Sequence, residues 1–246
     1  MIDINKVYCG DCLEIMQNIR AKSVDMVLCD LPYNTTQNSW DCAIDLKLLW
    51  EQYERIIKDN GAIVLTAQSP FDKILACSNL KLYKYEWIWE KTSATGHLNA
   101  KKAPLKAHEN ILIFYKKQPK YNPQKYKNCP PVHSYTKYQD DGSNYGKTKT
   151  GISGGGSTER YPRSVIVFKT DKQKEHFYPT QKPVKLFEYF IKTYTDEGDL
   201  VLDNCAGSFT TAIASENLKR NWICIEKEAE YCEVGRQRIE ENRKIL

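Results

Sequence analysis

The sequence predicts an α/β protein with a mostly parallel sheet that is covered by helices on both faces. Short apolar runs of strand length alternate along the chain with stretches whose apolar residues recur at helical spacing. Hydrophobic residues make up 41% of the 246 positions, which is enough for the core of one such domain. The alternation is lost only between residues 116 and 163, so we expect one domain with a loop-rich insertion.

The first half of the chain supplies five strands and three helices of this pattern. The expected strands are residues 7–9, 24–29, 62–66, 82–89 and 111–115. Helices are expected at residues 11–19 and 46–57 and after Ser69-Pro70, where Ser69 has the character of an N-cap and Pro70 of a first helical residue.

After residue 163 the regular pattern returns. Strands are expected at residues 165–168, 200–202 and 222–226, and helices at residues 184–194, 210–217 and 229–243. We therefore divide the chain into residues 1–115, an insertion at 116–163, and residues 164–246, with the first and last parts forming one domain.

Composition excludes several classes of protein. No apolar run approaches the length that spans a membrane, and the first residues lack the basic and apolar regions of a signal peptide, so we expect a cytoplasmic protein. The nine cysteines are odd in number, and several lie in apolar runs, as buried reduced thiols do. Cys9 and Cys12 form a lone C-x-x-C without a second pair at zinc spacing, so no metal is expected.

The segment Asp30-Leu31-Pro32-Tyr33 directly follows an apolar strand. Ligands bind beyond the carboxyl ends of the strands in parallel sheets, so the segment is placed for chemistry. Asp30 and the Leu31 carbonyl could accept hydrogen bonds from an amine, Pro32 would fix the turn, and Tyr33 offers a stacking face. Alone, the segment fits a plain turn with a capping Asp and a packed Tyr equally well.

A second segment, residues 203–211, forms a strand–glycine turn–helix unit. Gly207 allows the backbone to approach a ligand closely, and the helix N-terminus favours negative charge, here a carboxylate. About twenty residues later, the strand at 222–226 ends in Glu226, which is well placed to bind ribose hydroxyls. A dinucleotide site remains an alternative on this pattern alone.

Both segments resemble the DNA amino-methyltransferases. Asp30 to Tyr33 resembles their Asp-Pro-Pro-Tyr signature with Leu31 in place of the first Pro, and the leading Asp favours adenine over cytosine. Residues 203–211 resemble their Asp-Pro-Phe-x-Gly-Ser-Gly-Thr-Thr loop, which binds S-adenosyl-L-methionine. Phe209 departs from this loop, because glycine is usual there; the ring would either crowd the cofactor or pack under the helix.

Further segments resemble the same family, and their order indicates its β class. The resemblance covers nearly the whole chain outside 116–163 and implies a Rossmann-like S-adenosylmethionine methyltransferase fold. Residues 179–183, with His176, resemble its His-Pro-Thr-Gln-Lys-Pro segment, while residues 89–91 and 108–109 echo others. Residues expected to bind the cofactor are Asp11, Asp30, Thr180, Lys182, Asp203, Asn204, Ala206, Gly207, Ser208, Thr210, Thr211 and Glu226. The expected catalytic residues are Asp30, Leu31, Pro32 and Tyr33.

The insertion holds the basic excess of the chain. It carries ten Lys/Arg against three Asp/Glu, a balance of +7, while the rest of the chain sums to −2. The family has its target-recognition region here, so we expect double-stranded DNA as the partner, although a solvated loop is the alternative. The basic residues expected to contact DNA are Lys116, Lys117, Lys120, Lys125, Lys127, Lys137, Lys147, Lys149, Arg160 and Arg163.

These observations lead to one hypothesis and two alternatives. The hypothesis is direct methyl transfer from S-adenosyl-L-methionine to N6 of an adenine that is flipped out of duplex DNA. The alternatives are N4 methylation of cytosine and a DNA-binding protein whose cofactor pocket has decayed at Phe209. The resemblance also implies a homodimer, and a restriction endonuclease acting with the protein would be a separate chain.

Overall fold

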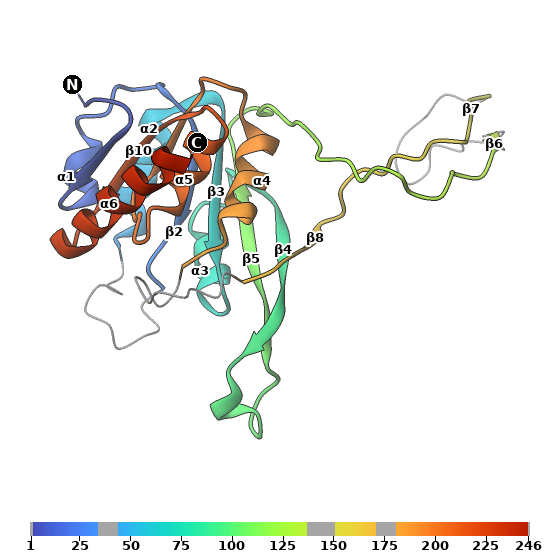
Figure 1. The fold of residues 1–246 in the computed structure, drawn as a ribbon, viewed down its shortest axis with the longest axis horizontal. Coiled ribbons are helices and arrows are strands. Elements are labelled where there is room, and N and C mark those ends of the chain that lie inside the picture. Colours follow the sequence, from blue (N-terminus) through green and yellow to red (C-terminus); the bar gives the residue numbers. More distant parts are fainter. Residues whose placement is uncertain (1, 34–43, 137–150, 171–180, 246) are drawn as a thin grey trace. The chain divides into compact units, whose positions relative to one another are not determined.

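The computed structural model describes residues 2–33, 44–136, 151–170 and 181–245. They form two compact units, residues 1–122 with 164–246 and residues 123–163. The first unit is built on an eight-stranded sheet with the strand order β1-β10-β9-β2-β3-β5-β4-β8 (Figure 1). Every neighbouring pair is parallel except β3/β5 and β5/β4, so the predicted mostly parallel sheet is confirmed.

The strands and helices of the first unit follow the predicted order. The strands are β1 (Lys6–Cys9), β2 (Val24–Asp30), β3 (Ile57–Ala67), β4 (Tyr83–Thr95), β5 (Lys106–Phe114), β8 (Val165–Phe168), β9 (Leu200–Asp203) and β10 (Asn221–Glu226). The helices are α1 (Cys12–Met16), α2 (Leu46–Ile56), α3 (Phe71–Ser78), η1 (His97–Asn99), α4 (Val184–Tyr194), α5 (Thr210–Asn217) and α6 (Ala229–Ile245).

The central strands bury both of their faces. On β2, Val27 and Cys29 belong to one apolar cluster, and Met26 and Leu28 belong to another. The first cluster includes residues of α1, α2 and α3, and the second includes residues of α4. Helices α5 and α6 pack on β10 on the same face as α4, which is toward the viewer in Figure 1. Helices therefore cover both faces, as an apolar run on a central parallel strand requires.

Several elements differ from their predicted bounds, among them β3, which begins five residues earlier than expected, and α1, which ends three residues earlier. Strands β4 and β5 extend as a hairpin beyond the apolar runs, with Thr95 paired to Lys106. The apolar pattern stops earlier because the ends of this hairpin leave the core. Helix α3 begins at Phe71, one residue later than predicted; Pro70 is its N-cap, and no side chain caps the helix.

The second unit begins seven residues later than the predicted insertion. Residues 116–122 belong to the first unit, where the ring of Tyr121 packs against Tyr194 at 6.1 Å between centroids and the Asn122 N–H donates to the Thr193 carbonyl at 2.8 Å. Within the second unit, β6 (Tyr135–Thr136) and β7 (Ser153–Gly154) form a short antiparallel pair.

Candidate active site

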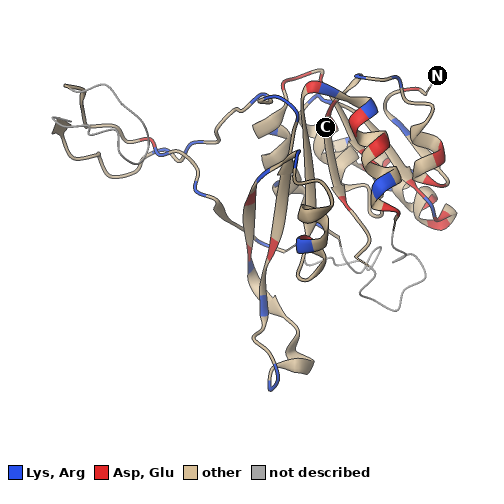
Figure 2. Cartoon of the chain, turned by 180° about the vertical axis from the view of Figure 1, so that it is seen from behind, with Lys and Arg blue, Asp and Glu red and all other residues tan. Residues whose placement is uncertain are grey.

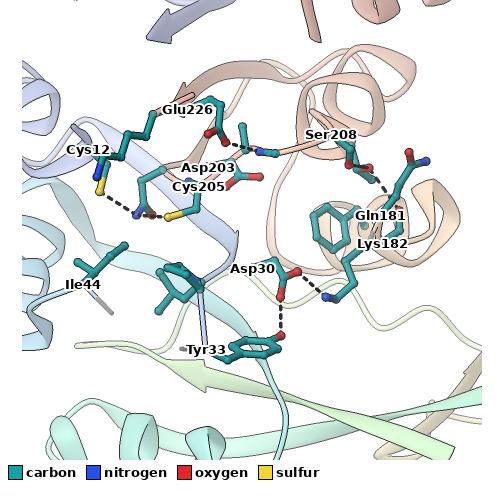
Figure 3. Close-up of a pocket in the computed structure, with 18 of the residues that line it drawn as sticks. Cys12, Asp30, Tyr33, Ile44, Gln181, Lys182, Asp203, Cys205, Ser208 and Glu226 are labelled. Atoms are coloured by element: carbon teal, nitrogen blue, oxygen red, sulfur yellow. Dashed lines mark hydrogen bonds and ion pairs between the residues drawn. The ribbon is translucent and has the colours of Figure 1, made fainter. Parts of the chain in front are cut away.

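A cavity of about 580 Å³ opens at the carboxyl ends of β2, β9 and β10. Strands β2 and β9 are neighbours, yet the chain leaves β2 toward α2 on one face and β9 toward α5 on the other. Such a reversal is where parallel sheets bind their ligands. Asp30 ends β2 and Asp203 ends β9, so both predicted strand-end acids line this one cavity (Figure 3).

On one wall, the Asp30 carboxylate accepts hydrogen bonds from two hydroxyl groups. The Tyr33 phenol donates to Oδ1 at 2.5 Å, and the Thr66 hydroxyl donates to the same oxygen. Burial raises the pKa of Tyr33 well above its ordinary value, and the negative charge of Asp30 adds to this, so the phenol stays protonated as a donor. The Tyr33 ring also packs against Phe71, with 5.3 Å between centroids.

Leu31 and Pro32 line the same wall. The Leu31 side chain is buried and joins the apolar cluster that includes residues of α1, α2 and α3. The departure from the family signature at this position therefore places an apolar side chain in the core.

A lysine closes this side of the cavity. The Lys182 ammonium forms an ion pair with Asp30 Oδ2 and lies 3.4 Å from Glu109 Oε2, while Lys91 lies 2.5 Å from Glu109 Oε1. Burial acts to lower the pKa of Lys182, but the negative charges of Asp30 and Glu109 outweigh it and raise that pKa well above its usual value. Burial likewise acts to raise the pKa of Glu109, but the two lysines bring it below its usual value.

On the opposite wall, backbone groups surround the acid that ends β10. The Gly207 N–H donates to Glu226 Oε2 at 2.8 Å, and the Glu228 N–H donates to Oε1 at 2.9 Å. Gly207 has φ +47°, a conformation that glycine adopts at low cost. Burial raises the pKa of Glu226, although these backbone donors oppose the shift.

Asp203 is buried beside this turn. Its Oδ1 accepts the Cys205 N–H at 3.1 Å, and its Oδ2 accepts the Thr211 hydroxyl at 2.6 Å. Burial raises the pKa of Asp203 to about 7 despite these donors. Within the described residues, no ion pair involves Asp203 or Glu226.

The Phe209 ring does not line the cavity. It is fully buried between α5 and α6, with a φ of +59° at the N-cap of α5. The ring occupies the space over Gly235, where an added Cβ would lie only 2.1 Å from a ring carbon. Of the two outcomes expected for this departure, the structure therefore shows the packed one.

The other predicted cofactor residues fall into two groups. Those that line the cavity with Asp30 and Asp203 are Asp11, Lys182, Asn204, Ala206, Gly207, Ser208, Thr210 and Glu226. Asp11 also caps α1 through the Leu13 N–H, and Asn204 Oδ1 accepts the Tyr53 hydroxyl at 2.5 Å. Thr211 lies behind the wall and is fully buried. Thr180 lies outside the described residues.

Three residues that hold Asp30 and Lys182 in place were not among the predicted ones. Thr66 contacts Asp30, and Glu109 contacts Lys182. Lys91 in turn contacts Glu109. Thr66 carried one signal in the sequence, because it is the polar residue that closes the apolar run 62–66.

The predicted DNA-contacting residues are divided between the two units. In the first unit, Lys116 donates to the Glu54 carbonyl, Lys117 pairs with Asp59, and Lys120 pairs with Asp196 and Asp199. The members in the second unit are Lys125, Lys127, Arg160 and Arg163. Lys137, Lys147 and Lys149 lie outside the described residues. In the described part of the second unit, an antiparallel bridge pairs Tyr126 with Arg160, and Figure 2 shows Lys and Arg residues along this unit.

The described part of the chain has neither a membrane-spanning helix nor a cluster of metal ligands. No helix there is long and apolar enough to cross a membrane. Likewise, no group of three or more His, Cys, Asp or Glu side chains in those segments could hold a metal ion.

Comparisons with known proteins agree with this geometry. The family model described as DNA methylase matches residues 24–237. The type II methyltransferase M.HpaI of Haemophilus parainfluenzae is 26% identical over 250 residues, which cover 96% of this chain and 74% of that protein. The DNA adenine methyltransferase YhdJ of Escherichia coli (strain K12) is 29% identical over 251 residues, which cover 94% and 81%.

The fold is similar to that of solved structures as well. The crystal structure of the M1.HpyAVI-SAM complex aligns with a TM-score of 0.65 at 24% identity, over 95% of this chain and 98% of that one. The family match extends over most of the sequence and includes both walls of the cavity. We therefore conclude that this chain belongs to the DNA methylase family, as its two motifs predict, with S-adenosyl-L-methionine as its methyl donor.

Proposed function

We propose that this protein methylates N6 of adenine in duplex DNA by flipping the base out and transferring the methyl group directly. One observation carries the proposal: Asp30 and Tyr33 face the same cavity as Gly207 and Glu226. An amine held on the first wall and a cofactor held on the second would share one enclosed space. The cavity of about 580 Å³ is within the range of roughly 300–1,000 Å³ that small-molecule sites span.

Asp30 and the Leu31 carbonyl are assigned to the base amine. The lone pair of that nitrogen is delocalised into the ring, so the amine is a poor nucleophile. Two acceptors on its protons favour the tetrahedral geometry that the nitrogen adopts as it attacks. Since Asp30 Oδ1 already accepts the hydroxyls of Tyr33 and Thr66, we assign the amine to Oδ2, which has one protein donor.

Glu226, Asp203 and Asp11 are assigned to the cofactor. S-adenosyl-L-methionine supplies an electrophilic methyl group on a sulfonium, and it also carries an ammonium group and ribose hydroxyls. Each Glu226 oxygen accepts one backbone N–H and keeps one lone-pair direction for a hydroxyl. Asp203 lacks a cationic partner among the described residues, so a cofactor cation could supply its counter-charge.

The burial of Phe209 argues against the alternative of a DNA-binding protein whose cofactor pocket has decayed at this residue. Its ring packs against Gly235 and leaves the cavity wall to Ala206, Gly207 and Ser208. Purified protein should therefore bind S-adenosyl-L-methionine, which a calorimetric titration would measure.

Sequence selection is assigned to the second unit, residues 123–163. Lys125, Lys127, Arg160 and Arg163 suit phosphate contacts, which give salt-dependent affinity. Exchanging this segment for that of a relative with another target should change the methylated sequence. Unchanged specificity would reject the assignment.

The reaction itself is tested with a labelled methyl group. The protein is incubated with unmethylated duplex DNA and labelled S-adenosyl-L-methionine, and the DNA is hydrolysed to identify the labelled base. We expect the label in N6-methyladenine. Label in N4-methylcytosine would keep the site and change the base, whereas no label on any DNA would reject the proposed function.

A further inference from the structure

Two segments that resemble the family have no role in the proposed function so far. They are residues 89–91, at the outer part of β4, and residues 108–109 on β5. The antiparallel register pairs Trp89 with Glu109 and Glu90 with His108, which brings both segments under one edge of the cavity. Each ends in a charged residue, Lys91 and Glu109, and both of these side chains line the cavity.

These two side chains begin a line of alternating charges that ends at Asp30. Lys91 Nζ lies 2.5 Å from Glu109 Oε1, Glu109 Oε2 lies 3.4 Å from Lys182 Nζ, and Lys182 contacts Asp30 Oδ2. The exposed fractions of the four side chains are 10%, 9%, 9% and 26%, so exposure is greatest at Asp30. Figure 3 shows the Lys182 ammonium directed at the Asp30 carboxylate.

We propose that Lys182 is a positioning residue for Asp30, and that Lys91 and Glu109 hold Lys182 in place for that purpose. The proposal rests on the proposed function, because Asp30 must be the group that receives the amine. Lys182 is thereby assigned to the acceptor wall, which is the side of the cavity formed by Asp30, Leu31, Pro32 and Tyr33, whereas the sequence had suggested a cofactor contact.

The geometry supports this assignment in two ways. The Lys182 ammonium has carboxylate oxygens of Asp30 and Glu109 beside it, so its charge is already balanced within the protein. A buried ammonium without such partners would be costly, and Glu109 in turn would carry an unbalanced charge without Lys91. The line therefore holds the Asp30 carboxylate at Oδ2, while the hydroxyl groups of Tyr33 and Thr66 hold it at Oδ1.

Lys182 is also distinct among the titratable groups around Asp30. Titratable groups that face Asp30 come from each neighbouring element: Lys182 before α4, Tyr33 after β2, Glu109 on β5 and Asp203 on β9. Lys182 is the cation among them that contacts Asp30.

The test compares Lys182→Met with Lys182→Arg in the full-length protein. The control is Lys185→Met, which removes a lysine three residues further on that is 78% exposed and pairs with Glu188. Single-turnover methylation rate and the calorimetric Kd for S-adenosyl-L-methionine are measured for each. We expect Lys182→Met to lower the rate by about a hundredfold, Lys182→Arg to recover roughly tenfold of it, and the cofactor Kd to stay within about threefold of wild type.

Each other outcome has a defined meaning. A cofactor Kd that rises in step with the loss of rate would make Lys182 a cofactor ligand and overturn the proposal. A rate equal to that of Lys185→Met would overturn it as well. Wild-type protein that methylates no DNA would instead reject the proposed function, so the two failures are distinguishable.

A double variant tests the outer part of the line. Lys91→Met should lower the rate by about tenfold on its own. Glu109 would then lose the ion pair with Lys91, and its full negative charge would act on the Lys182 ammonium. In the Lys182→Met background, the same change should cost much less, since Lys91 acts through Lys182. Additive losses would show that Lys91 acts independently and would overturn the outer half of the proposal. Lys91→Arg, which keeps the charge, covers the case in which Lys91→Met fails to fold.

Discussion

The two walls of the cavity hold their carboxylates by different means. On the acceptor wall, Asp30 is held by side chains: two hydroxyls and the Lys182 ammonium. On the cofactor wall, Glu226 is held by two backbone N–H groups, and Asp203 by one N–H and one hydroxyl, with no ion pair among the residues that the structure describes.

This difference determines which wall is complete without a ligand. A cation balances Asp30, whereas burial raises the pKa of both Asp203 and Glu226, which have only neutral donors as partners among the described residues. The wall that we propose receives the base is thus organised without a ligand. The cofactor wall has acids whose charge a positively charged ligand would stabilise, which gives that wall a physical preference for a sulfonium or an ammonium.

Removal of the Asp30 carboxylate should have the largest effect. We expect Asp30→Ala to lower the single-turnover rate by about a thousandfold or more, because the amine loses its charged acceptor. The cofactor Kd should stay within about threefold of wild type, since the cofactor wall is built separately. Asp30→Asn, which preserves the shape, is the matched variant. Full activity in either would place the acceptor elsewhere, and a large loss of cofactor affinity would show that the two walls are not independent.

The sequence predicted the acids of both walls but only part of their surroundings. Asp30, Asp203 and Glu226 each end an apolar run of strand length, and this local pattern is enough to place them at the edge of a parallel sheet. The partners Lys91 and Glu109 meet through the register of an antiparallel hairpin, which no local pattern encodes.

Packing and ion pairs decided two of the points that the sequence left open. From the sequence alone, the Phe209 ring could have crowded the cofactor. The structure shows that Gly235, on a helix 26 positions later, leaves room for the ring. Charge counts could not show that Lys117 and Lys120 pair with acids distant in sequence, because such a count records no contacts.

The unbalanced charge of the cofactor wall should give cofactor binding a pH dependence. The pKa of Asp203 is about 7 without ligand, so the side chain is neutral below that pH and ionised above it. A cationic ligand favours the ionised form; affinity should therefore weaken as the pH falls below 7, approaching about tenfold per pH unit. Calorimetry with S-adenosyl-L-methionine between about pH 5.5 and 7.5 measures this, and Asp203→Asn should flatten the slope. A constant wild-type Kd over that range would mean that no cofactor cation meets Asp203.

The smallest expected effect comes from a substitution beneath the cofactor wall. It tests whether the binding groups of that wall depend on the position of the backbone. Gly235→Ala would place a methyl group in the volume of the Phe209 ring, so the ring and the turn before α5 must shift. Overpacking of this kind costs about 1–3 kcal/mol of folding free energy, which thermal unfolding would register. Because the Gly207 N–H belongs to the same turn and holds Glu226, cofactor affinity should fall several-fold. Adding Phe209→Leu frees part of that volume and should restore both quantities in part. If Gly235→Ala lowered the methylation rate at saturating cofactor instead, the packing beneath the cofactor wall would also position the acceptor wall, and the two walls could not be treated as separate structures.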